Sequence, residues 1–546
     1  MALSSHHEKL ASKAADFSSA PVPSPTTSVS PTPSDSRIAI RVPSETEVPS
    51  SKEVETVNAE LATEAVEGTI VETANGERIY VEFVENDPRN PINFSRTRKW
   101  VITITTSTFI CAAVAGSSSY ALGWPSMTRD LHTTNFKATA GISTFTAGYA
   151  IVPLLISSIS EEFGRHPIYV VTTIGFMFMH LGVALADHIR TVLIVRFFGG
   201  VFGSGSILAA GTIADLWDPH ERGLPMAIFS FNAVAFTGLG PVFAGYVEQN
   251  PHLEWRWIQW IHLILCGVLA LATILFSKET RSDVILSRLA RKLRKETGDP
   301  RFRARVEDER ASLRTRIYIS VTRPFYFMFT EPAVASFSLW VGFAWGITFV
   351  LIESIAPVFK TLHNFSQGST GLVFITFFIG SSFGMCTNII QERLYAKHVG
   401  THGPEARLYH AMFAAILFPI AMYIYAWCTF PDVPWIALAI GITLFIWATF
   451  IMFLTVFNYL AECYGPFASS ALGGQALCRN AAAAGFPLFT QQMYSALTYH
   501  WANTMFANIA TLMIPIPFVL YFYGPQIRAR SKFASQVKHR YNLSNS

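Results

Sequence analysis

The stretch Arg196–Arg222, RFFGGVFGSGSILAAGTIADLWDPHER, decides the fold. An arginine lies inside an apolar run that continues as mainly Gly, Ala, Ser and Leu. A charged side chain at bilayer depth costs at least ~2.5 kcal/mol, so Arg196 needs a partner or a wet cavity. The glycines allow neighbouring helices to approach closely, and the charged turn after Asp215 ends the segment outside the bilayer. The stretch therefore predicts a tightly packed membrane helix that contains a buried cation.

The composition of the whole chain supports the same class of protein. Hydrophobic residues make up 51% of the 546 residues and charged residues 14%, which indicates a polytopic membrane protein. The net charge of +4 does not predict nucleic-acid binding, because the basic residues cluster between apolar stretches. The six cysteines lie in or beside those stretches without metal-ligand spacing, so we expect them to be packing residues.

Twelve apolar stretches follow the first part of the chain, and each is long enough to cross a hydrocarbon core of ~30 Å. They predict an all-α membrane protein whose spans divide six and six around a long polar connection. The predicted spans are 100–122, 140–159, 167–186, 191–214, 224–247, 258–276, 333–358, 370–390, 409–428, 434–459, 468–490 and 503–523.

The regions outside the spans set the expected domain boundaries. Residues 1–84 are rich in Ser, Pro and Thr, which predicts a disordered cytosolic tail. The first six-helix bundle is expected at 85–276 and the second at 331–523, joined by a cytosolic linker at 277–330. A basic cytosolic tail is expected at 524–546. Lys and Arg concentrate in the tails and in alternate loops, which places both termini inside the cell.

The linker contains a basic amphipathic pattern. Leu286, Leu289 and Leu293 recur at helical spacing among Arg and Lys residues. Such a helix either lies on the anionic inner leaflet or is a solvated helix that only joins the two bundles. The sequence leaves both readings open.

Several short motifs carry a family resemblance. They are DPRNPINFSRTRKW before the first span, SISEEFGRHP at Ser158–Pro167, GTIADLWDPHERG at Gly211–Gly223, NYLAECY at Asn458–Tyr464 and GFPLF at Gly485–Phe489. In this order and spacing, the chain resembles the major facilitator superfamily, specifically the fungal twelve-helix drug:H+ antiporter group. The resemblance implies two six-helix bundles around a central cavity that opens to each side in turn.

The loop between the second and third spans resembles the family motif that latches the cytosolic side in one conformation. Gly164 permits a tight turn, and Glu161 can accept hydrogen bonds from the backbone or from Arg165. The alternative is an ordinary charged hairpin. The residues expected in this latch are Glu161, Gly164, Arg165, Asp215, Arg222 and Arg479.

The fifth span, with the run GLGPVFAGY, resembles the motif that marks antiporters within the superfamily. Proline removes a helix hydrogen bond and glycines thin the helix, which predicts a bend packed tightly on a neighbour. Phe236 and Ala244 replace two of the usual glycines, so the match is partial, and a plain proline kink is the alternative. The motif residues are Gly238, Gly240, Pro241 and Gly245.

Three charged residues lie inside the predicted spans. Arg196 matches the family's helix-4 arginine, implicated in proton coupling, and the alternative is a structural arginine bonded to backbone carbonyls. Glu353 is expected to bind a proton or cation, or to be a helix-end residue wetted from outside. Arg479 is expected to contact the latch or the substrate. Further cavity-lining candidates are Asn232, Trp345, Trp447 and Asn458.

No nucleotide-binding loop, catalytic signature or metal-ligand set is present in the sequence, so we expect neither an enzyme nor a cofactor. We expect proton-coupled export of a small organic compound across the plasma membrane, or alternatively the vacuolar membrane. The expected partners are the substrate, protons and the lipid bilayer, for a monomer that binds no nucleic acid. Asn364 begins an external sequon and is expected to be glycosylated.

Two other functions remain open at this stage. One is a polyamine or organic-acid transporter that imports its substrate or only facilitates its diffusion. The other is a receptor on the same scaffold that does not transport.

Overall fold

The computed structural model of the chain describes residues 36–40, 66–73, 76–218, 221–309, 312–531 and 533. They form two compact units. The large unit comprises the described residues of Pro88–Ile285 and Leu313–Ser546, and the small unit those of Met1–Asp87 and Leu286–Ser312. The large unit is helical, whereas the small unit combines a sheet with helices.

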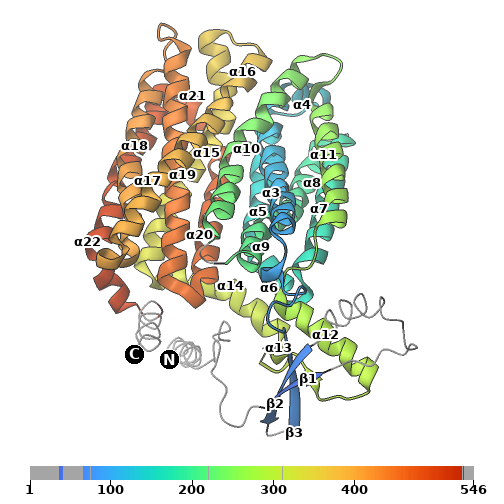
Figure 1. Ribbon diagram of the computed structural model, residues 1–546. Coiled ribbons are helices and arrows are strands. Elements are labelled where there is room, and N and C mark those ends of the chain that lie inside the picture. Colours follow the sequence, from blue (N-terminus) through green and yellow to red (C-terminus); the bar gives the residue numbers. More distant parts are fainter. Residues whose placement is uncertain are drawn as a thin grey trace, which may run out of the picture. The chain divides into compact units, whose positions relative to one another are not determined.

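Two groups of helices make up the large unit, coloured blue to green and yellow to red in Figure 1. Helices satisfy their own backbone hydrogen bonds, which a hydrocarbon environment requires. The first bundle contains α3 Arg96–Ser118, α4 Trp124–Asp130, α5 Asn135–Ile151, α6 Pro153–Phe163, α7 Arg165–Ala184, α8 Ile189–Gly203, α9 Leu208–Leu216, α10 Gly223–Gln249 and α11 Glu254–Phe276.

The second bundle follows helix α14 Leu313–Thr330, which lies inside the predicted linker. Its helices are α15 Pro332–His363, α16 Gln367–Val373, α17 Ile375–His402, α18 Leu408–Trp427, α19 Trp435–Tyr464, α20 Ala468–Gly485, α21 Pro487–Leu512 and α22 Pro515–Arg530.

The membrane-spanning character of these helices follows from their length and apolar composition. Among the described residues, nine helical stretches pass this test, or ten if the bent pair α5 and α6 forms one span. Two of the nine, Gln367–Trp427 and Pro487–Arg530, each contain more than one helix. Helix α20 does not pass, because Gln475, Arg479 and Asn480 interrupt its apolar residues. The chain is a multi-pass membrane protein, and the count of twelve spans stays a prediction.

Prolines begin new helices inside several predicted spans, and one special backbone conformation lies between two of the spans. The second span consists of α5 and α6, bent by 44° where Pro153 begins α6. The eleventh runs through α20 into α21, which Pro487 begins. Thr498, with φ of 64°, interrupts α21 between the predicted eleventh and twelfth spans. Helix α22 continues to Arg530, beyond the predicted end of the last span at 523. Its extra turns are held by Arg528, which donates to both carboxylate oxygens of Glu405 at 2.8 and 2.7 Å.

Aromatic and aliphatic side chains from five segments fill the centre of the first bundle. One buried cluster joins Phe109 of α3, Phe145 of α5, Phe176 of α7, Leu208 of α9 and Cys266 of α11. Within a bilayer, close van der Waals packing of such side chains stabilises the contacts between helices. The cluster therefore holds these helices of the first bundle together, so that the bundle can form one wall of a cavity.

The small unit is built on a four-stranded sheet. Strands β1 Ser36–Ile40, β2 Val66–Thr73 and β3 Gly76–Glu82 pair antiparallel, and the short β4 Phe302–Arg303 pairs parallel with β3. Helix α12 Ser282–Thr297, from Leu286 onward, and helix α13 Arg305–Glu309 complete the unit.

The strands correct the prediction of a disordered tail over 1–84. Residues 36–40, 66–73 and 76–82 form strands, while 1–35 and 41–65 lie outside the described residues. The missed signal is local: Asn75-Gly76 lies between the β-prone runs VEGTIVET and ERIYVE, and such a dipeptide between β-prone runs is typical of a hairpin. Because the first fifty residues are rich in Ser and Pro, the composition of the whole segment indicated disorder instead.

The same sheet covers the apolar face of the linker helix. Ile79 and Val81 of β3 are buried against Ala290 and Leu293 of α12, with Leu286 and Leu289 partly buried at the edge. Asp308 ties the sheet to the linker, because it accepts from Tyr80 at 3.2 Å and pairs with Arg303 at 2.9 Å and with Arg78. The leucines expected to enter the membrane surface therefore lie against the chain's own strands.

Truncation tests this packing. Deleting residues 1–84 removes Ile79 and Val81, whose burial contributes about 1.5–3 kcal/mol each, whereas deleting 1–35 leaves all described strands in place. We expect the longer truncation to accelerate tryptic cleavage at Arg303 or Arg305 by about tenfold or more, and the shorter one to leave it unchanged. Equal cleavage rates for the full chain and both truncations would contradict the assignment of the hairpin to the linker.

Candidate functional site

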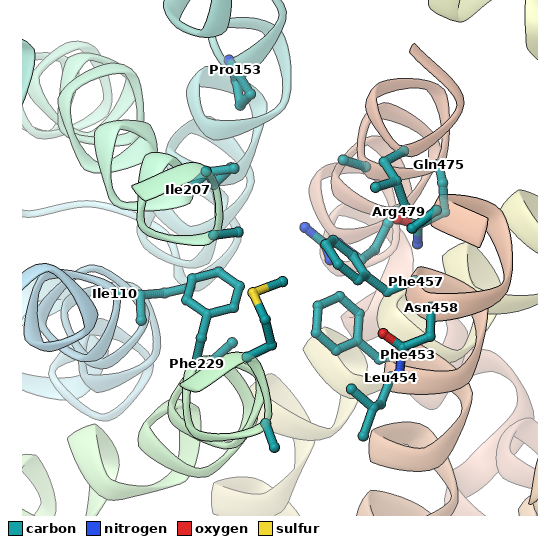
Figure 2. Close-up of a pocket in the computed structure, with 18 of the residues that line it drawn as sticks. Ile110, Pro153, Ile207, Phe229, Phe453, Leu454, Phe457, Asn458, Gln475 and Arg479 are labelled. Carbon is teal, nitrogen blue, oxygen red and sulfur yellow. The ribbon is translucent and has the colours of Figure 1, made fainter. Parts of the chain in front are cut away.

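A cavity of about 1270 Å³ lies between the two bundles of the large unit. Figure 2 shows Ile110, Ile207 and Phe229 on the side of the first bundle, facing Phe453 and Leu454 of α19 in the second. Most of the lining side chains are apolar. Such a chamber suits small organic molecules with a large hydrophobic surface.

The cavity reaches one end of the large unit. We call the end where α6 meets α7 and α9 meets α10 the basic end. Arg222, Glu392, Arg393 and Arg407 line the cavity there. Solvent and solutes can therefore enter the cavity at the basic end.

The opposite end is closed by close packing of α10 on α16. A Cβ atom added at Gly245 would lie 2.6 Å from the carbonyl oxygen of Gln367, so only glycine permits this approach. Gln249 accepts a hydrogen bond from the backbone N–H of Gly368 at 2.8 Å. The side chain of Gln367 donates to the carbonyl of Leu122 at 2.6 Å. These contacts join the two bundles and separate the cavity from the opposite end.

The glycine motif predicted in the fifth span contributes to this closure, because it lies in α10 and faces a neighbour on each side of that helix. A Cβ at Gly238 would collide with the carbonyl of Phe374 on the second bundle, and one at Gly240 would lie 2.5 Å from the carbonyl of Ala115 on α3. Pro241 lies inside α10, which continues as one helix. The glycines therefore allow α10 to pack closely against both bundles at once.

A cluster of charged residues at the basic end contains most of the predicted latch. Arg165 pairs with Asp215 at 2.8 Å, and its backbone N–H donates to Glu279 at 2.9 Å. Gly164 has a positive φ of 102°, which a residue with a side chain rarely adopts. Glu161 pairs with Arg316 of α14 at 2.5 Å. The cluster links α6, α7 and α9 to both ends of the linker.

Arg222 belongs to the same end but binds backbone. Its guanidinium donates to the carbonyl of Ala214 at 2.8 Å and to that of Trp217 at 3.0 Å, which are orphan groups at the end of α9. Partial burial lowers the pKa of Arg222, against the opposing effect of Asp215 and Asp218. Arg222 thus caps α9 rather than bridging to the second bundle.

Arg196 is 2% exposed and is held by three backbone carbonyls. Its Nε donates to Gly141 at 3.1 Å, and its two Nη atoms donate to Gly116 at 2.9 Å and Ser117 at 3.2 Å. The guanidinium also lies 4.2 Å from the ring centre of Tyr120. These contacts fit the structural alternative, in which the arginine ties α8 to α3 and α5.

Glu353 of α15 is 7% exposed, and neither carboxyl oxygen has a hydrogen bond of ordinary geometry among the described residues. Polar groups near it include Thr139 of α5 and Gln491 and Tyr494 of α21. Thr139 lies half a turn from Gly141, which binds Arg196. A carboxylate left unpaired in such a place is costly, which distinguishes Glu353 from the paired acids of the basic end.

Two of the four predicted cavity-lining residues line the cavity. Trp345 and Asn458 do so, whereas Asn232 and Trp447 do not. The Trp447 Nε1–H donates to Thr387 at 3.1 Å, so the ring points toward α17. Asn232 precedes the lining residue Ala233, and successive helix residues point about 100° apart.

Arg479 lines the cavity and takes no part in the cluster at the basic end, as far as the described residues show. It lies 5.0 Å from the ring centre of Trp345 and 5.1 Å from that of Phe453. The expected contact to the latch is therefore absent among the described residues, and Arg479 lies at the cavity wall instead. The neighbouring Gln475 and Asn480 also line the cavity and were missed, although polar residues one turn apart in an Ala-rich helix are the signal that marks them.

Two remaining predictions concern sites outside the cavity. Asn364 is exposed and ends α15 in the left-handed conformation, a geometry asparagine tolerates, and its glycosylation stays a prediction. Among the residues that the structure describes, no group of three or more His, Cys, Asp or Glu side chains is arranged to hold a metal ion.

Comparison with known proteins identifies the class to which this architecture belongs. The sequence pattern of the Major Facilitator Superfamily matches residues 104–487. The chain is 34% identical over 462 residues to the major facilitator superfamily multidrug transporter mdrA of Aspergillus fumigatus, covering 84% of this chain and 76% of that protein. It is 32% identical over 468 residues to the multidrug transporter FLR2 of Candida glabrata, covering 83% and 79%.

A solved structure shows the same fold at low sequence identity. A bacterial homologue of the human lysosomal transporter Spinster, in an inward-facing and occupied conformation, matches with a TM-score of 0.56 at 12% identity, covering 79% of this chain and 98% of that one. The family pattern and the relatives together show that the chain is a transporter, not an enzyme. It belongs to the Major Facilitator Superfamily.

Proposed function

We propose that the protein exports small organic compounds across the plasma membrane by exchanging them for protons. The observation that carries this proposal is a large apolar cavity that is open at the basic end and closed at the other by the glycines of α10. The excess of Lys and Arg in the loops of the basic end supports a cytosolic location for it. The cavity would then load from the cytosol.

The direction of transport is supported by the relatives. Two of them are named multidrug transporters, and one from Gibberella moniliformis, 31% identical over 463 residues, is named an efflux pump. A polyamine substrate is disfavoured, because among the described residues one carboxylate lines the cavity, that of Glu392, and it lies 3.5 Å from Arg407. One chain supplies both walls of the cavity, so a monomer suffices for the proposed cycle.

We assign the proton to Glu353 rather than to Arg196. The three donor groups of Arg196 are engaged by carbonyls, whereas the Glu353 carboxyl group is buried between α5, α15 and α21 without such partners. Helix α5 belongs to the first bundle, so a change in its position alters the surroundings of Glu353. Binding and release of a proton there would be coupled to the opening of the two bundles.

Inside-out vesicles with an acidified lumen test the coupling. They are incubated with an organic extract of the culture medium, and mass spectrometry identifies compounds that concentrate only in vesicles containing the protein. One pH unit supplies about 1.4 kcal/mol per proton, enough for roughly tenfold accumulation at one-to-one exchange. We expect a protonophore to abolish this accumulation and Glu353→Gln to exchange substrate without concentrating it.

The matched control is Glu254→Gln, which removes a carboxylate paired with the exposed Arg129 at the opposite end. This variant should concentrate substrate normally. Accumulation that persists with the protonophore would contradict proton coupling. A glutamine variant at 353 that still concentrates substrate would remove only Glu353 from the proposal.

A further inference from the structure

We propose that the cavity is selective for organic anions, in particular compounds with one carboxylate on an aromatic or aliphatic body, and that Arg479 binds the carboxylate. The inference rests on the proposed function in that it takes the cavity to be the transport site. It adds to that function by specifying the charge and the shape of the substrate.

The first observation is the isolation of Arg479 from any acidic partner. Its Nε donates to the Asn480 side chain at 3.3 Å, and among the described residues its Nη atoms make no hydrogen bond and no carboxylate pairs with it. Figure 2 shows Arg479 with Gln475 and Asn458 on the side of the cavity formed by the second bundle. Four N–H groups of the guanidinium are thus available to a ligand.

Other arginines of the large unit show that this isolation is a property of the site. Arg165 pairs with Asp215, Arg407 with Glu462 at 2.7 Å, and Arg528 with Glu405 at 2.7 Å. Where no acid is present, Arg196 is held by three carbonyls. Arg479 has neither arrangement, so its counter-charge is best supplied from the cavity. A carboxylate fits because it accepts two parallel hydrogen bonds from the planar fork.

The second observation is the charge of the whole lining. In the part of the chain that the structure describes, four arginines and one glutamate line the cavity, and the glutamate, Glu392, is close to Arg407. Low-dielectric walls focus such a charge and concentrate ions of the opposite sign. The arginines are Arg222, Arg393, Arg407 and Arg479. An anion is attracted along the whole path, whereas a cation meets no carboxylate of the described residues at the depth of Arg479.

The third observation is the apolar surface around the guanidinium. The ring centres of Trp345 and Phe453 lie 5.0 and 5.1 Å from its central carbon, and Leu454 and Phe457 extend the wall beside them. Aromatic rings at this spacing can stack on a planar body attached to the bound carboxylate. The volume of about 1270 Å³ exceeds that of an ordinary ligand pocket. The cavity therefore discriminates more strictly between charged groups of a substrate than between apolar bodies of different size.

Equilibrium binding tests this inference without any gradient. The purified full-length protein in detergent is titrated calorimetrically with three probes of similar shape: naphthalene-2-carboxylate, naphthalene-2-carboxamide and 2-naphthylmethylammonium. We expect the carboxylate to bind at least about tenfold more tightly than the other two, as a charge-assisted bidentate pair in a partly dry site predicts.

Variants assign the preference to one side chain. Arg479→Gln should lower carboxylate affinity about tenfold and leave amide affinity within about twofold, and Arg479→Lys should retain part of the preference, since it keeps the charge but loses the fork. Arg291→Gln, which removes an exposed positive charge from α12, is the control and should bind all three probes as the unaltered protein does. Size-exclusion chromatography reports the folded fraction of each variant.

Three results would overturn the inference: an amide or ammonium probe that binds as tightly as the carboxylate, a protein that binds none of the three, or an Arg479→Gln variant that keeps the full preference. The comparison of probes on the unaltered protein stands even if a variant fails to fold. Proton-driven accumulation of neutral compounds in the vesicle assay, together with no carboxylate preference, would keep the proposed function and reject the anion class. Failure of proton coupling would leave the binding result intact.

Discussion

Replacing Gly245 by leucine is expected to drive the protein out of the conformation in which the cavity is open at the basic end. The added Cβ alone would lie 2.6 Å from the carbonyl oxygen of Gln367 and 3.0 Å from the Cα atom of Gly371, and both are backbone atoms that cannot rotate away. Overpacking of this kind costs about 1–3 kcal/mol. A difference of that size changes a two-state population roughly 5- to 150-fold.

Native Cys386 reports the change. It lines the cavity and is exposed, so an impermeant maleimide added to inside-out vesicles should label it in the unaltered protein. In Gly245→Leu we expect the labelling rate, identified on the Cys386 peptide by mass spectrometry, to fall at least about fivefold. The matched control is Gly267→Leu on α11, where an added Cβ would meet only the sulfur of Met177 at an ordinary 3.6 Å.

The opposite result would locate the closure elsewhere. If Gly245→Leu folds and Cys386 is labelled at the rate of the unaltered protein, the contact between α10 and α16 does not control access to the cavity. If both leucine variants lose labelling equally, added bulk rather than the close approach is responsible.

Replacing Arg196 by lysine is expected to reduce the amount of folded protein far more than it reduces transport by each folded molecule. One ammonium nitrogen cannot reach the carbonyls of Gly116, Ser117 and Gly141, which belong to two helices. Each hydrogen bond lost from the charged guanidinium costs about 1.5–3 kcal/mol, a large part of a total stability of about 5–15 kcal/mol. The cost is high because the side chain is buried, so bulk water does not replace the lost donors.

Folded amount and transport are measured on the same sample. Size-exclusion chromatography with a fluorescent fusion gives the folded fraction, and vesicle uptake divided by that fraction gives transport per molecule. Arg256→Lys is the control, because Arg256 is about one-third exposed and donates to a single carbonyl, that of Ala186. If Arg196→Lys folds in the normal amount but loses transport, proton coupling would have to be assigned to Arg196 after all.

The fifth predicted span, helix α10, shows what can and cannot be predicted from the sequence. The run GLGPVFAGY identifies residues that permit close approach, because glycine lacks a side chain wherever it lies. Which backbone approaches is a different matter: Gly240 faces α3 of its own bundle, and Gly238 and Gly245 face α16 and the start of α17 in the other. Those contacts join residues more than a hundred positions apart, and no local pattern encodes them.

Arg196 and Arg479 show the same difference between what the sequence predicts and what only the tertiary structure determines. Apolar flanks alone mark Arg196 and Arg479 as buried charges in need of partners. The partners differ, because Arg196 meets carbonyls at the end of α3 and Arg479 meets aromatic rings and the cavity. Trp447 and Asn232 were placed in the cavity on residue type alone, and their true directions depend on the rotation of each helix.

The sequence by itself determined the membrane class, the two bundles, the motif family and the glycines of α10, because hydropathy, charge asymmetry and side-chain size act locally along the chain. Tertiary structure alone decided that strands near the N-terminus cover the linker leucines, that the cavity opens at the basic end, and that Arg479 rather than Arg196 faces it. The physical reason is that helix rotation and pairing between distant segments are fixed by packing over the whole molecule, where a few ångströms separate a bonded side chain from one that faces the cavity.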